Sequence, residues 1–104
     1  MNTQQPLKMY VLLRKEFTPE YSAAQGGHAL VKYKDEYPEL AKVWGNETIV
    51  YLGVRFPGGL RNWKQKLMEL GVRCSIWREP DQDGQITAIA CVHNGSIFKD
   101  LHLL

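Results

Sequence analysis

A continuous apolar run near the N-terminus constrains the fold more than any other feature of the sequence. Residues 9–13 read Met-Tyr-Val-Leu-Leu without a polar interruption, between Lys8 and Arg14. Alternation of polar and apolar residues is typical of a strand with one face in water, whereas an unbroken run is typical of a strand covered on both faces. We therefore expect a central strand here, in a sheet with helices on both sides.

A helix over residues 19–36 is expected directly after this strand. Thr18 is a preferred N-cap residue, and Pro19 suits the first helical position, where its missing N–H is not needed. Small and apolar residues then recur at helical spacing and predict the buried face: Ala23, Gly26, Leu30, Tyr33 and Tyr37. Gly26 and Gly27 each cost roughly 0.5–1 kcal/mol relative to Ala inside a helix. We expect a strand or a ligand to approach the backbone there.

The rest of the chain alternates strand and helix patterns and then ends in a hairpin. β-branched and aromatic residues predict a strand over residues 48–54, and apolar positions at helical spacing predict a helix over residues 60–70. Residues 72–77 and 86–92 predict two further strands. The turn cluster Asp-Gln-Asp-Gly at 81–84 lies between them and makes the pair antiparallel.

These elements predict one α/β domain over residues 1–104 with the order β-α-β-α-β-β. Helix-length crossovers imply parallel neighbours among the first strands, and the final hairpin makes the four-stranded sheet mixed. With helices on both faces, the expected architecture is a three-layer α/β/α domain. Pro38 should end or kink the first helix, residues 40–44 could form a further turn, and the apolar tail of residues 94–104 should dock on the body.

Composition excludes several classes of protein. The chain has 104 residues, is 44% hydrophobic and carries a formal charge of +2, which rules out the composition of disorder and leaves only a local patch for phosphate binding. It has no apolar stretch long enough for a membrane and begins with no secretory signal, so a cytoplasmic protein is expected. Cys74 and Cys91 fit no metal-site spacing and are expected to be buried, reduced thiols that could approach each other across the hairpin.

Polar residues gather where the first strand meets its helix. Arg14 and Lys15 end the strand, Thr18 opens the helix, and Gln25 and His28 lie three residues apart on one side of it. Ligands of open α/β sheets bind beyond the carboxyl ends of parallel strands. An imidazole can act as acid or base near neutral pH and an amide can orient a water, although His28 could equally be a packing histidine. The common nucleotide and metal fingerprints are absent, so no cofactor and no metal is expected.

The same helix resembles a family signature. Residues 23–29 read Ala-Ala-Gln-Gly-Gly-His-Ala, which resembles the Ala-Ala-Gln-(small)-(small)-His-Ala signature on the first helix of the archaeal and eukaryotic type of peptidyl-tRNA hydrolase. The first strand ending in Arg14 resembles that family's first strand. Trp-Arg-Glu at 77–79 and Thr-Ala-Ile-Ala at 87–90 resemble its later motifs, in the same order and at approximately the same spacing.

The resemblance implies a mixed sheet with helices on both faces and metal-free hydrolysis of the ester that joins a peptide to the terminal adenosine of tRNA, the substrate and partner. Carried over by position, the catalytic candidates are Gln25, His28, Glu79, which stands where the family has an aspartate, and Thr87. The candidates for substrate binding are Arg14, Lys15, Thr18, Tyr21 and Arg78.

The sequence departs from the family pattern at two places. Tyr21 stands where the family has a lysine, two positions before Ala-Ala-Gln, and Lys15 is a candidate substitute for the lost cation. After Glu79, residues 80–85 read Pro-Asp-Gln-Asp-Gly-Gln, which is shorter and more acidic than the family segment. The lost cation favours a second hypothesis, an inactive relative that binds RNA or another protein through the same cleft.

Two further surfaces leave alternatives open. Four basic residues on or after the second helix indicate either contact with an RNA backbone or only the solvated face of an amphipathic helix: Arg61, Lys64, Lys66 and Arg73. A third hypothesis is an interaction protein whose Leu-rich C-terminus packs across a homodimer. Trp44, Trp63 and Trp77 could anchor a core or stack a base, and core packing is expected for at least two of them.

Overall fold

Five strands form one mixed sheet at the centre of the computed structural model, which describes residues 6–55 and 58–104. Along the chain these strands are β1 (Lys8–Arg14), β2 (Ile49–Val54), β3 (Ser75–Glu79), β4 (Gln85–His93) and β5 (His102–Leu103). In space their order is β3-β4-β1-β2-β5. β1 pairs in parallel with β2, and the other three pairings are antiparallel. β1 is therefore the central strand, as predicted.

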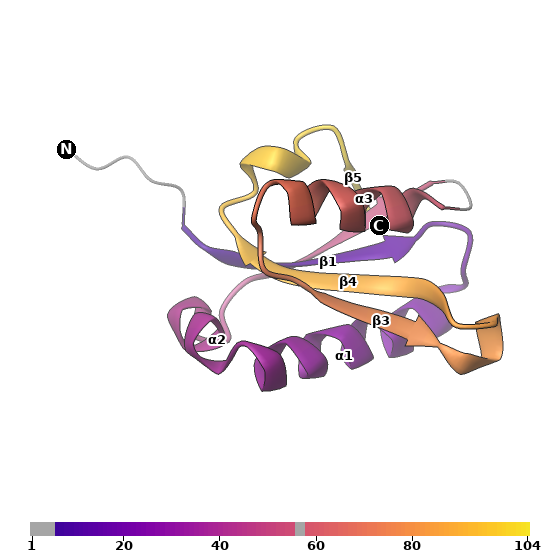
Figure 1. Ribbon diagram of the computed structural model, residues 1–104, viewed down its shortest axis with the longest axis horizontal. Helices are drawn as coiled ribbons and strands as arrows, with labels where there is room; N and C mark the ends of the chain where they lie inside the picture. The colour runs from indigo at the N-terminus through magenta and orange to yellow at the C-terminus, as the bar shows by residue number, and fades with distance from the viewer. Residues whose placement is uncertain (1–5, 56–57) are drawn as a thin grey trace.

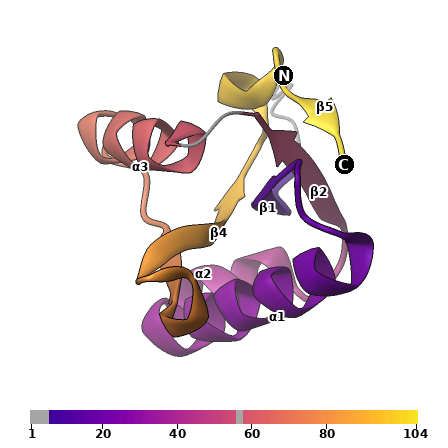
Figure 2. The same cartoon turned by 90° about the vertical axis from the view of Figure 1, so that its right-hand side faces the viewer.

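Helices cover both faces of this sheet. α1 (Pro19–Glu36) and the short α2 (Pro38–Trp44) lie on one face, and α3 (Gly59–Glu69) lies on the other (Figures 1 and 2). Two 3-10 turns complete the secondary structure, η1 (Pro80–Gln82) between β3 and β4 and η2 (Ser96–Phe98) near the C-terminus. The predicted three-layer arrangement is confirmed.

The number of strands was predicted wrongly, because the sequence indicated four. The fifth, β5, is only two residues long and pairs with β2 through Leu52 and Gly53. Both of its residues are exposed, so the segment has neither the length nor the alternation that identifies a strand. The tail does dock on the body, since Phe98 is buried and packs against Tyr10 with 4.9 Å between ring centroids.

Element bounds differ from the sequence prediction mainly at β3. Residues 72–74 belong to the connection from α3, because Gly71 adopts a positive φ and the Val72 N–H bonds to the Leu67 carbonyl. β3 begins at Ser75, and a register shift interrupts its pairing with β4 between Trp77 and Arg78. The predicted loop at 57–59 is described only from Gly58, since residues 1–5 and 56–57 lie outside the described residues.

The buried face of α1 is rotated from the predicted stripe. Ala23 is exposed, whereas Ser22 and Gln25 are buried together with Gly26, Ala29 and Tyr33. A Cβ on Gly26 would lie 3.3 Å from the Cγ1 of Val11, so the helix approaches β1 most closely there. A Cβ on Gly27 would meet nothing within 4 Å. The expected approach of a strand is therefore confirmed for Gly26, whereas no described part of the protein approaches Gly27.

The two cysteines are free thiols, one in β4 and one in the segment that leads into β3. Cys91 is buried in β4 and Cys74 is half-buried just before β3. Burial raises the pKa of the Cys91 thiol to about 12 and also raises the pKa of Cys74. In the described ranges no helix is both long and apolar enough to cross a membrane.

Candidate functional site

A buried hydrogen bond joins α1 to β4. The Thr87 hydroxyl donates to the Gln25 Oε1 over 2.5 Å. Thr87 is fully buried and Gln25 is 3% exposed, so water competes little for this bond and its orientation is fixed. The amide group of Gln25 keeps its two N–H donors for other partners.

Glu79 lies at the end of β3, within reach of these donors. The Trp77 indole N–H donates to Glu79 Oε2 over 3.1 Å. This bond lowers the pKa of Glu79 below its usual range. Partial desolvation opposes it, while the Gln25 amide, the Asp81 backbone and the charge of His28 add to it. The carboxylate is therefore ionised at neutral pH and acts as a hydrogen-bond acceptor.

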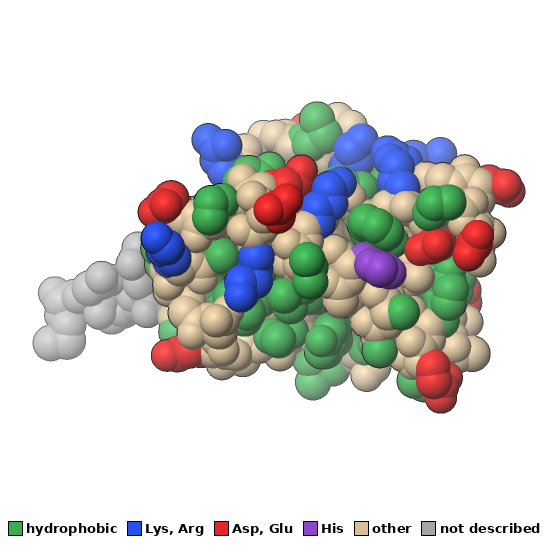
Figure 3. All heavy atoms as spheres, turned by 90° about the horizontal axis from the view of Figure 1, so that it is seen from below, with side chains coloured by type: hydrophobic (Ala, Val, Ile, Leu, Met, Phe, Trp, Pro, Cys, Tyr) green, Lys and Arg blue, Asp and Glu red, His purple; other side chains and the backbone are tan. Residues whose placement is uncertain are grey.

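His28 stacks on Trp77 at the surface rather than packing in the core. The two ring centroids lie 4.4 Å apart with 17° between the ring planes. Both rings line an open hollow of about 910 Å³ along α1, which small residues such as Ala24 and Gly27 and the exposed Val31 also line. Figure 3 looks onto this face, where hydrophobic side chains and a histidine lie open beside Lys and Arg side chains. The imidazole is therefore accessible to a ligand.

The four catalytic candidates of the sequence analysis come together with one addition. We call this set the polar cluster: Gln25, His28, Trp77, Glu79 and Thr87. Trp77 was not among the predicted site residues, although it stands two positions before Glu79 in the motif that supplied Glu79. Of the other tryptophans, Trp44 is buried in the core and Trp63 is half-buried against it.

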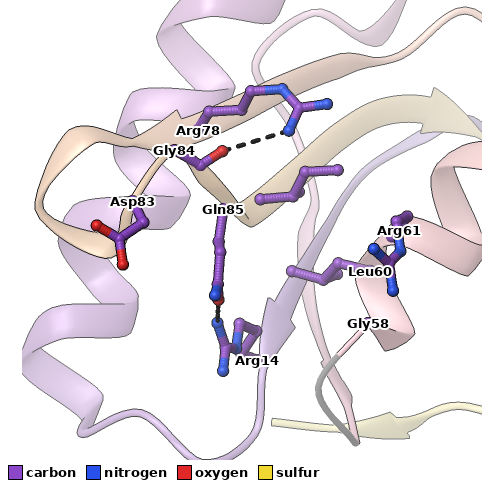
Figure 4. Close-up of a pocket in the computed structure, with 9 residues that line it drawn as sticks. Arg14, Gly58, Leu60, Arg61, Arg78, Asp83, Gly84 and Gln85 are labelled. Carbon is purple, nitrogen blue, oxygen red and sulfur yellow. Dashed lines mark hydrogen bonds between the residues drawn. The ribbon is translucent and has the colours of Figure 1, made fainter.

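Two of the five candidates for substrate binding lie on the opposite face of the sheet. Arg14 and Arg78 line a pocket of about 380 Å³ between the sheet and the start of α3 (Figure 4). We call it the arginine pocket, because Arg61 of α3 adds a third guanidinium. Its lining residues are Arg14, Gly58, Leu60, Arg61, Arg78, Asp83, Gly84, Gln85 and Ile86.

The remaining three candidates have other surroundings. Thr18 is the N-cap of α1, where its hydroxyl accepts from the Tyr21 N–H. The Tyr21 ring packs edge-on against Phe17, and its buried hydroxyl has no partner among the described residues. Lys15 lies against Gly53 in a different hollow, together with Asp100. In this arrangement Lys15 does not replace the lost cation in the polar cluster.

Metal ligation has no support in the geometry. Within residues 6–55 and 58–104, no three His, Cys, Asp or Glu side chains are placed to hold an ion. The chemistry available to the polar cluster is that of one carboxylate, one imidazole, one amide, one hydroxyl and one indole N–H. Such groups orient and deprotonate water, and they bind carbonyl oxygens.

Comparisons with known proteins bear on the fold. No family model matches the sequence, and no curated protein matches it. The chain is similar to a solved structure of a protein of unknown function from Agrobacterium tumefaciens, with a TM-score of 0.71 and 15% sequence identity. The similarity covers 95% of this chain and 98% of that one. At this identity it shows a shared fold and nothing about activity.

Proposed function

We propose that the protein is an esterase of the peptidyl-tRNA hydrolase kind, with its reaction centre at the polar cluster. The observation that carries the proposal is the buried Thr87–Gln25 hydrogen bond, which joins two of the candidates across 62 positions of the chain. Glu79 and His28 stand beside this bond, within electrostatic reach of each other. Four residues chosen from sequence motifs alone are thus neighbours in space.

Each member of the cluster has a distinct part in this reaction. Thr87 holds the Gln25 amide in one orientation, and the Trp77 indole holds the Glu79 carboxylate, whose pKa the nearby Gln25 amide also lowers. A water that donates to this carboxylate would be aimed at the ester carbonyl carbon. Because its pKa is lowered, Glu79 is a weak base that orients the water more than it deprotonates it.

The proton balance of hydrolysis can be completed by His28. As the water oxygen bonds to the carbonyl carbon, the water's proton passes toward Glu79. As the ester C–O bond breaks, the exposed imidazole donates a proton to the ribose oxygen. The proton on Glu79 then passes through solvent to His28, and the new carboxyl group of the peptide releases its proton to water. The products are the free peptide carboxylate and the tRNA hydroxyl, with no change in oxidation state.

Tyr21 favours a second candidate function, a binding module without hydrolysis. The family that the sequence resembles has a lysine there, which could stabilise negative charge on the reacting carbonyl. In this chain the position carries a phenol whose ring packs on Phe17. A cluster without that cation could still bind the end of an RNA through the stacked His28 and Trp77 rings.

Hydrolysis of an N-blocked aminoacyl-tRNA by the purified protein separates the two functions. We expect Gln25→Ala and His28→Ala each to lower kcat/KM by at least about tenfold, as is common when a positioning or acid-base group is removed. Gln65→Ala and His102→Ala are matched controls, because these side chains are exposed and lie on α3 and β5. A folded wild-type protein that gives no turnover would leave the binding module as the function.

A further inference from the structure

The arginine pocket combines a cationic rim with an apolar floor. Its three guanidinium groups come from the end of β1, from β3 and from the first turn of α3, so they surround the pocket from three directions (Figure 4). Leu60 and Ile86 lie between them and are 3% and 8% exposed. The volume, about 380 Å³, falls in the range of roughly 300–1,000 Å³ that is typical of small-molecule sites.

Arg14 lines the pocket with a guanidinium group that hydrogen bonds hold in place. Its Nε and Nη2 donate to Glu16 Oε2 over 2.8 and 2.5 Å, and its Nη1 donates to Gln85 Oε1 over 2.8 Å. The guanidinium also lies over the Phe17 ring, 4.6 Å from its centroid. Glu16 neutralises its charge, so Arg14 contributes shape and its remaining N–H donors more than net charge.

Within the described residues, Arg61 and Arg78 have no carboxylate at salt-bridge distance. The salt bridge found among the described residues joins Arg14 to Glu16. Arg78 donates to the neutral carbonyl of Gly84 over 3.3 Å. Asp83 lines the pocket, but Figure 4 shows its carboxylate pointing away from the three guanidinium groups. The pocket therefore has an excess of positive charge with donors to spare.

Glycines at the start of α3 allow close approaches by Arg61 and Val54. Gly58 has a φ of +87°, and a Cβ on it would lie 3.1 Å from Arg61 Nη2, so the guanidinium folds back over the helix start. A Cβ on Gly59 would lie 2.7 Å from Val54 Cγ1. The first turn of α3 has no acidic residue, and its N-cap has no side-chain hydrogen bond. A cation at this end of a helix is unfavourable unless an anion compensates it.

We propose that the arginine pocket binds the phosphate group of a nucleotide. Planar guanidinium groups match phosphate oxygens with paired hydrogen bonds. The apolar floor of Leu60 and Ile86 would take the attached ribose or base. The pocket lies on the α3 face, opposite the polar cluster, so the proposal stands whether or not the cluster hydrolyses an ester.

Two sources can supply such a phosphate, and the neighbouring surface distinguishes them. A smaller hollow at the free edge of β3 shares Arg78 with the arginine pocket and is also lined by Lys32, Lys64 and Trp77. Lys32 and Trp77 in turn line the hollow beside His28. A single-stranded RNA bound at the pocket could follow this path around β3, with Lys64 on its backbone, whereas a free mononucleotide would fill the pocket alone.

Calorimetric titration with adenosine 5′-monophosphate tests the proposal directly. We expect Arg61→Ala and Arg78→Ala each to weaken binding at least about tenfold, the usual loss for a charge-assisted hydrogen bond. Arg73→Ala, which removes an exposed arginine outside the pocket, should leave the affinity within about twofold. Arg61→Lys and Arg78→Lys keep the charge and should lose affinity through the missing paired donors.

A parallel titration with a single-stranded RNA ending in CCA identifies the source. RNA that binds more tightly than the mononucleotide, and loses affinity in Lys64→Ala, identifies an RNA end. Equal affinity for both ligands, with Lys64→Ala unchanged, identifies a free nucleotide. Either result upholds the phosphate site. Folded wild-type protein that binds neither ligand at millimolar concentration overturns it, as does an Arg73→Ala variant that loses as much as the pocket variants.

Discussion

The polar cluster and the arginine pocket lie on opposite faces of β3 and β4. They differ in how far their polar groups are hydrogen-bonded within the protein. In the cluster, the Thr87 hydroxyl, the Gln25 oxygen and the Glu79 carboxylate all have hydrogen-bond partners within the protein. In the pocket, most N–H donors of Arg61 and Arg78 have no partner among the described residues. A satisfied network holds a few groups in a fixed geometry, whereas spare cationic donors attract an anion. The fixed geometry of the cluster suits chemistry on a small group, and the spare donors of the pocket suit binding of an anion.

Thr87→Val should have the largest effect on stability. The substitution keeps the shape of the side chain but leaves the buried Gln25 oxygen without its donor, which costs about 1–3 kcal/mol. Urea unfolding measures the loss. The double variant Thr87→Val, Gln25→Leu should recover part of it, because neither polar partner remains. A single variant as stable as the wild type would mean that the cluster is not held by this bond.

Gly27→Ala should stabilise the protein by about 0.5–1 kcal/mol, the gain in helix propensity from glycine to alanine. The added methyl group meets nothing within 4 Å and lies in the hollow beside His28. Gly26→Ala is the matched variant, because its methyl group would press against Val11 in β1. Thermal unfolding should give a higher Tm for Gly27→Ala than for Gly26→Ala. The reverse order would contradict the approach of α1 to β1.

Glu16→Gln should change stability by less than about 1 kcal/mol, because the Glu16 carboxylate of the Arg14 pair is well exposed. Partial burial works to raise the pKa of Glu16, but the hydrogen bond and charge of Arg14 outweigh it and the pKa is lowered. The pair therefore stabilises the fold above the pKa of the unfolded chain, and this is lost as the pH falls through the folded value. Urea unfolding of the variant and of the wild type from neutral to acidic pH measures this contribution to the free energy of unfolding. A larger loss of stability in Glu16→Gln than in Thr87→Val would contradict the view that internal hydrogen bonds hold the cluster more firmly than the pocket.

Trp77→Phe should raise the pKa of Glu79 toward its usual range, because the indole N–H is the main cause of the lowering. The acid side of the pH-rate profile should move to higher pH, since Glu79 then takes up a proton earlier as the pH falls. An NMR titration of the Glu79 carboxyl gives the shift directly, and Trp63→Phe is the control from outside the cluster. An unchanged Glu79 pKa would remove Trp77 from the network.

Local sequence signals were enough for the strongest elements of the fold. Both ends of β1 lie where the apolar run predicted them, and α1 begins at the Thr18-Pro19 signal and ends before Pro38, as predicted. β5 could not be predicted, because two exposed residues form a strand only through their partner β2. The start of β3 was missed because Val72 continues the hydrogen bonding of α3. Elements that depend on a distant partner leave little trace in the local pattern.

The two sites also differ in how far the sequence could predict them. The cluster residues Gln25, His28 and Glu79 could be proposed from motifs, because the resemblance marks their positions in the chain. The burial of Gln25 was missed, since a polar residue reads as exposed until its partner Thr87 is placed. The arginine pocket joins residues 14, 61 and 78 through the sheet order β3-β4-β1 and the crossing of α3. No spacing in the sequence indicates that meeting.

Steady-state hydrolysis of an N-blocked aminoacyl-tRNA by three proteins tests the division between the two faces most directly. We expect Gln25→Ala to lower kcat with little change in KM. We expect the Arg61→Ala, Arg78→Ala double variant to keep its kcat, with a raised KM if the pocket holds an RNA end and an unchanged KM if it holds a free nucleotide. A folded wild-type protein without turnover, or a double variant that lowers kcat as much as Gln25→Ala does, would contradict the assignment of the reaction to the polar cluster.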